Sequence, residues 1–419
     1  MPSTSKVLIA CVVTLMATLM IGVAPTSAQT PTPTPTPSGT STPTPVPTTE
    51  PTPTPTEPAG AVTLRASRNR ITFGQAVTLS GSIDHAVGGE TIEIIDQDGR
   101  TRATTTTDNR GRFSVRLRPR VNSLLRARWL VAVSPSEPVR VKPIVTASLS
   151  SVYLFGKSKV TGRVRPMHRG DRIKVNLVRN GKTTISKRVR LNRRSKFSTK
   201  FTIWKPGTYK VRAMFDNDQH VPGFANTSRR TPSTPSLSNG SNSVYVKNLE
   251  KRLDQLGYHI TGINTHYDHR TSDAMIAFNK VQGRSRVGYV TSSTWYALAE
   301  PKRPRPVSKS PGFHVEVDQS KQVLYMVRNG KVRKILHVST GAGGATRNGV
   351  YHFFREVNGY SGGGLYYPTY FDGLRAIHGW PSVPTYNASH GCVRVPMWAA
   401  KWAFDTVELG HEIRVYGTP

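Results

Sequence analysis

The sequence predicts a multidomain, mainly β chain with one small helical domain between β-rich ones. At 419 residues it is too long for one ordinary core, since domains average about 150 residues. A segment with alternating apolar positions occurs twice in tandem, at offsets of 81 to 84 residues. Apolar residues at helical spacing then occupy 244–300, ahead of a second strand-rich region at 312–419.

The N-terminus predicts an exported protein. Lys6 precedes the apolar run Val7–Val23 and a group of small residues, which is the pattern of a signal peptide, here residues 1–28. A lipoprotein-type cleavage before Cys11 is disfavoured because the apolar run continues past it. An uncleaved membrane anchor stays open, although the run is slightly short for a span of about 20 residues. The expected location is the cell wall or the extracellular space, with membrane tethering if the signal is retained.

The sequence has two cysteines, Cys11 and Cys392. Removal of the signal peptide leaves Cys392 as the sole thiol of residues 29–419. An unpaired cysteine in an exported protein indicates a reactive thiol or an intermolecular disulfide. The alternative is a small buried apolar residue.

The net charge of +34 is unevenly distributed. Residues 151–230 hold 21 lysines and arginines against 3 carboxylates, a net charge of +18, whereas 61–150 carry +7, 231–300 carry +2 and 301–419 carry +8. A basic module outside the cytoplasm favours anionic wall polymers or an anionic membrane surface. Nucleic acid is the usual partner at this pI, but the export signal argues against it. Solvated strand faces explain the charge equally well.

Residues 29–60 form a Thr-Pro repeat with 11 prolines. Proline fixes the backbone and lacks an N–H donor, so this linker is expected to be an extended spacer. Whether its threonines carry sugars is open.

The tandem segments, 61–144 and the strongly basic 145–232, predict two β-sandwiches. Each has short alternating stretches separated by Gly, Asn and Asp turns. The pair resembles bacterial immunoglobulin-like modules, although neither copy has the Cys–Trp–Cys core of antibody domains. The matching landmarks are Phe73-Gly74 with Phe155-Gly156, Ser80-Gly81 with Thr161-Gly162, Gly89–Ile94 with Gly170–Val175, and Gly111–Ser114 with Ser195–Ser198.

A linker at 233–243 precedes three predicted helices in 244–300. Gly257 is expected to end the first, Thr271 to cap the second, with Asp273 in its first turn, and Thr291 to cap the third. The layout resembles the small three-helix peptidoglycan-binding domain, which implies a glycan-binding role. The matching positions are Val246, Leu249, Leu253, Leu256, Ala274, Phe278, Trp295 and Leu298. The run His266–His269 could hold a metal, but a polar turn accounts for it.

A basic, proline-rich linker, 301–311, leads into the strand-rich region 312–419. The run Phe313–Asp318 alternates, and Val323–Val327 and Lys331–Val338 flank Asn329-Gly330, a strong hairpin signal.

The candidate catalytic residues lie between His378 and Arg394. His378-Gly379 precedes Cys392 by 14 residues. A cysteine nucleophile needs a base, a fixed base tautomer and N–H donors for an oxyanion. His378 and His390 are candidate bases, and neighbouring glycines let backbone amides approach a substrate. The cysteine stretch reads Ser389-His390-Gly391-Cys392-Val393-Arg394.

This stretch closely resembles the catalytic domain of L,D-transpeptidases, marked by His-Gly, a spacer, and Ser/Thr-His-Gly-Cys followed by an apolar residue and Arg or Asn. The resemblance covers about Gly312–Tyr416. It implies that Cys392 attacks, that His378 takes its proton, and that the carbonyl of Gly379 holds the other nitrogen of the imidazole.

The resemblance also implies that amides around Gly391 and Cys392 bind the oxyanion, while Ser389, His390 and Arg394 shape the site. Two departures concern specificity: the loop 380–388 is short, and the Thr-Pro-x-Gly turn of the family stands here as Thr346-Arg347-Asn348-Gly349.

Other side chains have open interpretations. Tyr367 and Tyr370 could line a substrate groove or pack in the core, and Trp398 and Trp402 are expected to lie in the core. A zinc site at His378 and Cys392 lacks further ligands, so no metal is expected.

The resemblance implies a peptidoglycan L,D-transpeptidase that forms 3→3 cross-links through a cysteine thioester. It implies no cofactor, and it implies acylation of Cys392 by carbapenems. The expected partners are stem peptides and glycan, with the protein a monomer. An L,D-carboxypeptidase that resolves the same thioester with water is one alternative, and a non-catalytic wall-anchoring protein is another.

Overall fold

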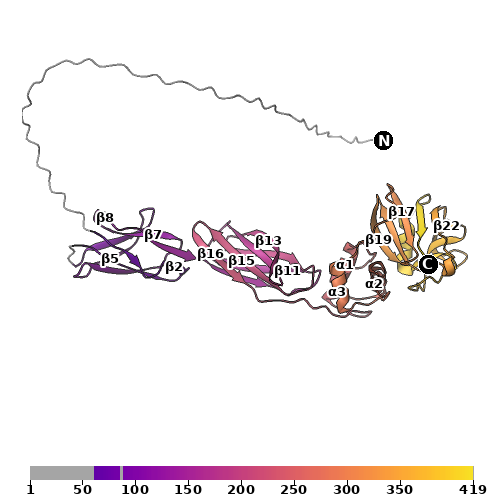
Figure 1. Cartoon of the computed structure of the whole chain (residues 1–419), viewed down its shortest axis with the longest axis horizontal. Coiled ribbons are helices and arrows are strands. Elements are labelled where there is room, and N and C mark those ends of the chain that lie inside the picture. Colours follow the sequence, from indigo (N-terminus) through magenta and orange to yellow (C-terminus); the bar gives the residue numbers. More distant parts are fainter. Residues whose placement is uncertain (1–60, 85–87, 419) are drawn as a thin grey trace, which may run out of the picture. The chain divides into compact units, whose positions relative to one another are not determined.

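The computed structural model of the chain describes residues 61–84 and 88–418. The predicted signal peptide, 1–28, and the predicted Thr-Pro linker, 29–60, lie outside the described residues. The described chain contains, in order, two β-sandwiches, a three-helix unit and a β-rich C-terminal unit (Figure 1), which confirms the predicted fold class. No helix in these ranges is long and apolar enough to cross a membrane.

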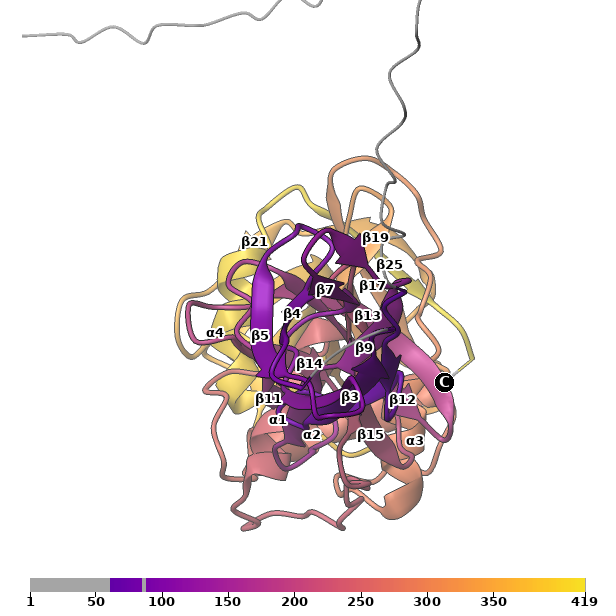
Figure 2. The ribbon, with the colours of Figure 1, turned by 90° about the vertical axis from the view of Figure 1, so that its left-hand side faces the viewer.

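The first sandwich packs two sheets against each other, with strand orders β1-β3-β6 and β2-β9-β7-β4-β5, and β8 paired to β7. Alternate residues point inward, as predicted: Ile92 and Ile94 are fully buried, while Thr91 is exposed. Figure 2 shows strands of this sandwich from one end. The strands are β1 (Arg65–Ala66), β2 (Arg70–Thr72), β3 (Val77–Ser82), β4 (Thr91–Ile95), β5 (Thr101–Thr106), β6 (Arg112–Leu117), β7 (Ser123–Trp129), β8 (Ala132–Val133) and β9 (Glu137–Lys142).

The second sandwich has the sheets β10-β11-β14 and β13-β12-β15-β16. Its inward residues Ile173, Val175 and Leu177 alternate with outward polar ones along β12. The strands are β10 (Ile144–Leu149), β11 (Lys157–Arg165), β12 (Arg172–Arg179), β13 (Lys182–Arg190), β14 (Lys196–Thr202), β15 (Tyr209–Asn217) and β16 (His220–Asn226).

A glycine–aromatic pair lies at the same place in both sandwiches. Gly81 on β3 is the cross-strand partner of Phe113 on β6, and Gly162 on β11 is the partner of Phe197 on β14. A Cβ at Gly81 would lie 2.6 Å from the Phe113 ring, and one at Gly162 would lie 2.3 Å from the Phe197 ring. Each ring therefore covers a glycine that no other residue could replace without movement. The repeat in sequence is a repeat in structure.

The three-helix unit consists of α1 (Val244–Gln255), α2 (His269–Gln282) and α3 (Ser292–Ala299). The predicted cap at Thr291 is confirmed, and Gly257 lies just past the end of α1 with a φ of +93°. The unit buries its apolar helix faces in one cluster with residues of the second sandwich and of the C-terminal unit.

The predicted cap of α2 at Thr271 is wrong. Asp268 is the cap, because its carboxylate accepts hydrogen bonds from the N–H groups of Arg270 and Thr271. Thr271 lies inside the helix, and its hydroxyl donates to the buried carboxylate of Glu250 at 2.6 Å. Asp273 consequently falls beyond the first turn. A buried acceptor on α1 fixes this threonine, and local capping patterns contain no information about such an acceptor.

The two predicted linkers that lie within the described residues, 233–243 and 301–311, make ordered contacts. In 233–243, Leu237 is buried and bridges to Val290. In 301–311, the N–H groups of Val307 and Ser308 donate to the carboxylate of Glu316 at 3.0 and 2.9 Å.

The C-terminal unit has two sheets, β19-β18-β17-β25-β20 and β21-β22-β23-β24. Its apolar core includes Val315 and Val317 of the first sheet, Ile377 and Val393 of the second, and alanines of α4. The elements are β17 (Phe313–Asp318), β18 (Val323–Arg328), β19 (Lys331–His337), the 3-10 turn η1 (Ala342–Gly344), β20 (Gly349–His352), β21 (Arg355–Glu356), β22 (Tyr366–Asp372), β23 (Arg375–Trp380), β24 (Val393–Pro396), α4 (Met397–Thr406) and β25 (Glu412–Tyr416).

The predicted hairpin at Asn329-Gly330 is confirmed, with φ of +51° and +66° as a type I′ turn requires. Strand β17 differs from a half-buried strand, because its polar row, His314, Glu316 and Asp318, is buried as well. The linker amides that bind Glu316 help to cover this second face.

The glycine–aromatic pairs generate a prediction about stability. We expect Gly162→Ala to destabilise the second sandwich by about 1–3 kcal/mol, because the added Cβ overlaps the Phe197 ring. Thermal unfolding of the whole chain measures this as a lower transition temperature. Gly362→Ala is the control, since a Cβ added at that glycine would have no atom within 4 Å. Equal transitions for the two variants would contradict the packing argument.

Candidate active site

Cys392 lies directly before β24 and carries a free, half-buried thiol. Its Sγ lies 3.7 Å from the carbonyl oxygen of Leu374, to which it can donate a weak hydrogen bond. A backbone hydrogen bond from Ala376 on the neighbouring strand also reaches the thiol. The sulfur is thus held at the sheet end while part of it stays accessible.

His378 lies on β23, which runs parallel to β24. Ile377 and Val393 are paired across these strands and both point into the core. Because side chains alternate along a strand, His378 and Cys392 both lie on the opposite face, as diagonal neighbours. Within the described structure no hydrogen bond joins them.

The His378 imidazole has a fixed orientation. It is 2% exposed, and its Nδ1 lies 2.9 Å from the carbonyl oxygen of Gly379. A carbonyl only accepts, so Nδ1 carries the proton and Nε2 keeps its lone pair. The edge of the Trp380 ring system, with centroids 5.5 Å apart, holds the imidazole from the side. This arrangement suits a general base.

The two groups are uncharged at neutral pH. Burial raises the pKa of the Cys392 thiol above its ordinary 9.0, an effect opposed by the Ala376 hydrogen bond and by Arg394 and Arg375. Burial lowers the pKa of His378 below 6.5, and the Arg394 charge lowers it further. A thiolate–imidazolium pair is therefore disfavoured before substrate binds.

Ser389 shapes the nucleophile loop from within. Its Oγ accepts from the N–H of Gly391 at 3.1 Å and donates to the carbonyl of Cys392 at 2.5 Å. The carbonyl of Gly391 in turn accepts from Thr346 Oγ1 at 2.9 Å. Of the two amides expected at an oxyanion site, Gly391 N–H is thus already bonded, whereas Cys392 N–H has no acceptor among the described residues.

The remaining predicted site residues lie at different places around the sheet β21-β22-β23-β24. His390 is exposed beside the cysteine. Arg394 pairs with His378 across the strands and lies 5.2 Å over the Trp380 ring. Tyr367 packs on Phe404 of α4, at a centroid distance of 5.2 Å, and so lies on the helix side.

Tyr370 lines a hollow of about 480 Å³. The residue is 6% exposed, and the Arg355 guanidinium lies 3.8 Å over its ring. Residues 361–363 of the glycine-rich loop also line the hollow, as does Leu374. Leu374 connects the hollow to the cysteine, because its carbonyl contacts Sγ of Cys392.

A buried network holds the cysteine loop from beneath. The carbonyl of Thr340 accepts from the N–H groups of Ala388 and Ser389 at 2.8 and 3.0 Å. Thr340 is fixed by Gln322, whose amide accepts from Thr340 N and donates to Thr340 Oγ1, both at 2.7 Å. Gln322 is 2% exposed and has a φ of +57°. Gln322 thus supports the cysteine loop through Thr340, in addition to the bonds made by Ser389 and Thr346.

Lys280, on α2 of the three-helix unit, inserts behind this glutamine. Its Nζ contacts the carbonyls of Gln322 and Val338 at 2.9 and 3.0 Å and Nδ1 of His337 at 2.7 Å. Nε2 of His337 donates to the carbonyl of Val383 at 2.9 Å, so its Nδ1 is the acceptor. Three acceptors match the three N–H groups of an ammonium, whereas burial opposes the charge and lowers the pKa of Lys280 to about 6.

Further contacts join the three-helix unit to the loop between the two candidate catalytic residues. Arg286 donates to the carbonyl of Thr385 at 2.7 Å and to that of Ser320 at 2.8 Å. Arg286 thus holds the short loop 380–388 from the three-helix unit, and the His337–Val383 bond holds it from within the C-terminal unit.

The predicted core positions of Trp398 and Trp402 are only partly correct. Both rings are half-buried, and both stack on His259 of the three-helix unit, at 5.2 and 3.7 Å. The Trp398 indole also donates to Asp273 at 2.7 Å. They pack between the two units because α4 presents this side to α2.

Sequence reasoning marks Cys392 and His378 as candidates but contains no sign of the contacts of Lys280, Arg286 and Gln322 or of the bonding role of Thr346. No pattern marks these residues, because each acts on a segment distant in sequence. The run His266–His269 serves the fold: Asp268 caps α2, and the buried Tyr267 donates to Gly288 O at 2.7 Å. The described residues contain no group of three or more His, Cys, Asp or Glu that could hold a metal.

Comparisons with known proteins find a family match in the C-terminal unit. Residues 312–415 match the family model of the YkuD L,D-transpeptidase catalytic domain. A solved L,D-transpeptidase of Xylanimonas cellulosilytica is 35% identical, over 44% of this chain and 99% of that chain, with a TM-score of 0.42. One from Stackebrandtia nassauensis is 26% identical, over 45% of this chain and 98% of that chain, with a TM-score of 0.29. No curated protein sequence matches.

The buried network predicts that Lys280→Met lowers both stability and catalytic rate. Methionine keeps the packing volume but leaves the Val338 carbonyl and Nδ1 of His337 without a donor, and it removes one of the two donors to the Gln322 carbonyl, at a cost of roughly 3 kcal/mol. We expect a lower transition temperature in thermal unfolding and a fall in kcat larger than the rise in KM. Lys247→Met, at an exposed position of α1, should change neither quantity. Equal behaviour of the two variants would contradict the role of Lys280.

The electrostatics predict how thiol reactivity depends on pH. Alkylation of Cys392 by iodoacetamide should accelerate with pH and reach half its maximal rate above pH 9, because burial raises the pKa of the thiol. Peptide mass spectrometry assigns the modified cysteine. A rate that is already maximal near pH 7 would show a preformed thiolate and contradict the uncharged pair.

Proposed function

Because this chain belongs to the L,D-transpeptidase family, with a YkuD catalytic domain at residues 312–415 that acts on peptidoglycan, we propose that it is a cysteine-dependent peptidoglycan L,D-transpeptidase that forms 3→3 cross-links. The carrying observation is the half-buried thiol of Cys392 on the same sheet face as His378, whose Nδ1 is fixed by Gly379.

The proposed first step is acylation. Sγ turns from the Leu374 carbonyl toward the carbonyl carbon of the third residue of a donor tetrapeptide, while Nε2 of His378 takes the thiol proton. The oxyanion of the tetrahedral intermediate accepts from Cys392 N–H. When the intermediate collapses, the bond to the terminal D-amino acid breaks, and its nitrogen takes the proton from His378. A thioester on Cys392 remains.

The second step transfers the acyl group. A side-chain amine of a neighbouring stem attacks the thioester carbonyl and loses a proton to His378. The carbon–sulfur bond then breaks, and the sulfur recovers the proton. The Cys392 thiol and the His378 imidazole are uncharged before the reaction. Sγ therefore loses its proton to His378 as it attacks the donor, and the acceptor amine loses its proton to His378 as it attacks the thioester.

The hollow connected to the cysteine by Leu374 is the proposed donor site. Leu374, whose carbonyl contacts Sγ, and Tyr370 line it, and the Arg355 guanidinium lies over the Tyr370 ring. A cation there can attract a carboxylate of the stem peptide. Residues 361–363 form another wall, where glycines leave space for a substrate.

The other units are proposed to deliver the enzyme to the wall. Residues 244–300 are the proposed peptidoglycan-binding domain, 61–144 and 145–232 the two immunoglobulin-like modules, and 312–419 the catalytic domain. Export through residues 1–28 and extension through 29–60 complete this assignment. The contacts of Lys280 and Arg286 support close cooperation between the proposed binding domain and the catalytic site.

The proposal predicts the products formed from tetrapeptide muropeptides. Wild type should give cross-linked dimers, Cys392→Ala none, and His378→Ala a rate lower by about 10²–10⁴-fold, the usual contribution of a general base. Product mass spectrometry measures this.

His352→Ala, which changes an exposed histidine on β20, is the control and should retain activity. Dimers formed by Cys392→Ala would refute the proposal. Trimmed monomers alone from wild type would identify an L,D-carboxypeptidase, and full activity in His378→Ala would move the base role to His390.

A further inference from the structure

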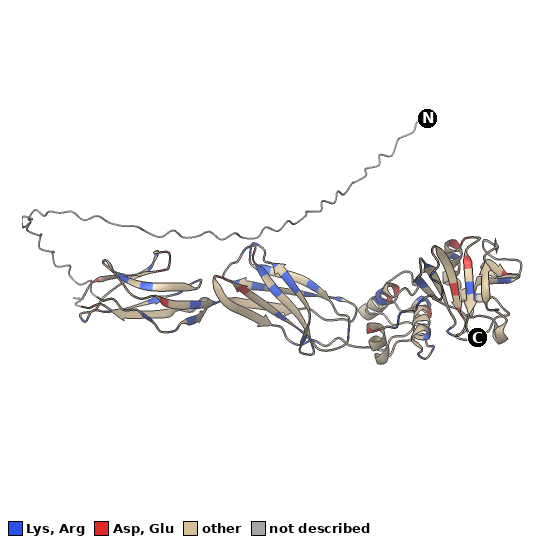
Figure 3. Ribbon diagram, turned by 45° about the horizontal axis from the view of Figure 1, so that its top comes forward, with Lys and Arg blue, Asp and Glu red and all other residues tan. Residues whose placement is uncertain are grey.

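The outer face of the β13-β12-β15-β16 sheet carries a ladder of cations. Along β12, buried Ile173 and Val175 point inward, so Arg172 and Lys174 point outward. Arg172 lies opposite Arg190 of β13, and Lys174 lies opposite Arg188. Figure 3 shows blue lysines and arginines, and few red carboxylates, on the strands of this sandwich.

The ladder is electrostatically unfavourable by itself. Like charges directly opposite each other on neighbouring strands repel. Of these cations none forms an ion pair in the described structure, and neither does Arg212 on β15. A surface that is only solvated does not need cations opposite each other, and alternating positive and negative side chains would stabilise the sheet more. An anionic ligand would remove the repulsion.

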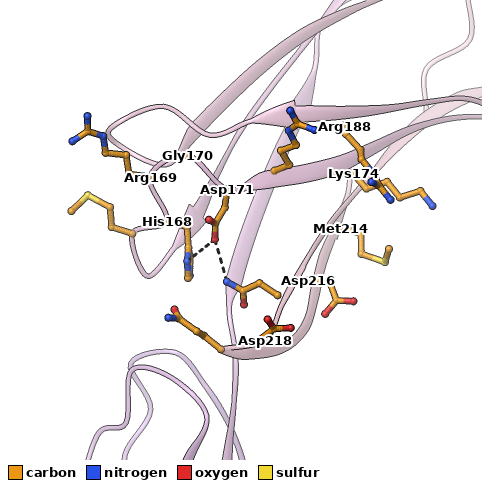
Figure 4. A pocket seen from close by; sticks show the side chains of 13 residues that line it. His168, Arg169, Gly170, Asp171, Lys174, Arg188, Met214, Asp216 and Asp218 are labelled. Atoms are coloured by element: carbon orange, nitrogen blue, oxygen red, sulfur yellow. Dashed lines mark hydrogen bonds and ion pairs between the residues drawn. The ribbon is translucent and has the colours of Figure 1, made fainter.

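A hollow of about 980 Å³ adjoins the ladder. Figure 4 shows Arg188 and Lys174 on one side of it and Asp216 and Asp218 on another. A third carboxylate, that of Asp171, is already bonded to His168 and Asn217. The hollow is therefore a concave site with a cationic wall and an acidic end.

The chemistry of the ladder favours oxyanions on a chain. Arginine predominates, and its planar guanidinium binds phosphate oxygens in pairs, whereas lysine acts as a point charge. The row extends along two strands and continues to Arg212, which lies 5.2 Å over the ring of Phe224. A flexible linear polymer can follow such a row into a concavity, whereas a flat bilayer surface cannot enter it.

We propose that the outer face of this sheet, with the hollow beside it, is a binding site for a linear phosphate-bearing polymer of the cell wall. The ladder of Arg172, Lys174, Arg188 and Arg190 contacts successive phosphates, and Asp216 and Asp218 mark the end of the site. The site needs only that the chain is exported, as proposed above. It does not depend on the chemistry at Cys392.

The test measures binding of the full chain to long-chain inorganic polyphosphate and, separately, to vesicles of anionic phospholipid. The variant of the face is Arg172→Gln, Lys174→Gln, Arg188→Gln. The matched control removes three charges from the other sheet of the same sandwich: Lys159→Gln, Lys196→Gln, Lys200→Gln. Lys159 and Lys200 also oppose each other, so both variants relieve a like-charge contact. Thermal unfolding verifies that both fold.

The face variant should lose polyphosphate affinity by about tenfold or more, and the control by much less, because the phosphates follow the arginine ladder. Wild-type affinity should fall as salt rises. Equal losses in the two variants would show a response to net charge alone and overturn the site. Binding to vesicles without binding to polyphosphate would overturn it too. Transpeptidase activity on soluble muropeptides should be unchanged in the face variant, which separates this proposal from the proposed reaction.

Discussion

The buried amino group of Lys280 joins α2 to the network beneath the cysteine loop. Its Nζ contacts the carbonyls of Gln322 and Val338 and Nδ1 of His337 in the C-terminal unit, which are buried acceptors that apolar packing would not satisfy. Gln322, held on one side by Lys280, holds Thr340, and Thr340 holds the cysteine loop. Each bond in the series is made by a group with few alternatives, because all of them are buried.

This series explains why a catalytic loop with glycines can be well defined. Gly391 has a φ of +133°, a conformation that gives the cysteine its place at the sheet end. The amide of Gly391 is bonded to Ser389 and its carbonyl to Thr346. These two hydrogen bonds fix the backbone in a conformation that glycine adopts readily. The free amide of Cys392 is what remains for a substrate. The polar interior thus positions the reacting atoms without itself taking part in the chemistry.

The sequence was sufficient for the strands and the Asn329-Gly330 hairpin, because those signals are local, and a family motif marks Cys392 and His378 as candidates. The sequence was insufficient where a residue distant along the chain determines the hydrogen bonds or the burial of a side chain. Thr271 has the residue type of a cap but bonds to Glu250, and β17 alternates but is covered on both faces. Lys280 has an ordinary helical context. Its role depends on the packing of α2 against the turn before β18, and a single sequence does not show that these two segments are in contact.

The central claim is that acyl transfer passes through Cys392. Intact-protein mass spectrometry, after rapid mixing with a tetrapeptide donor and no acceptor, tests it most directly. The account predicts an adduct with the mass of the donor less its terminal D-amino acid, mapped to Cys392 and released by hydroxylamine. Turnover of the donor with no adduct, or an adduct on another residue, would contradict it.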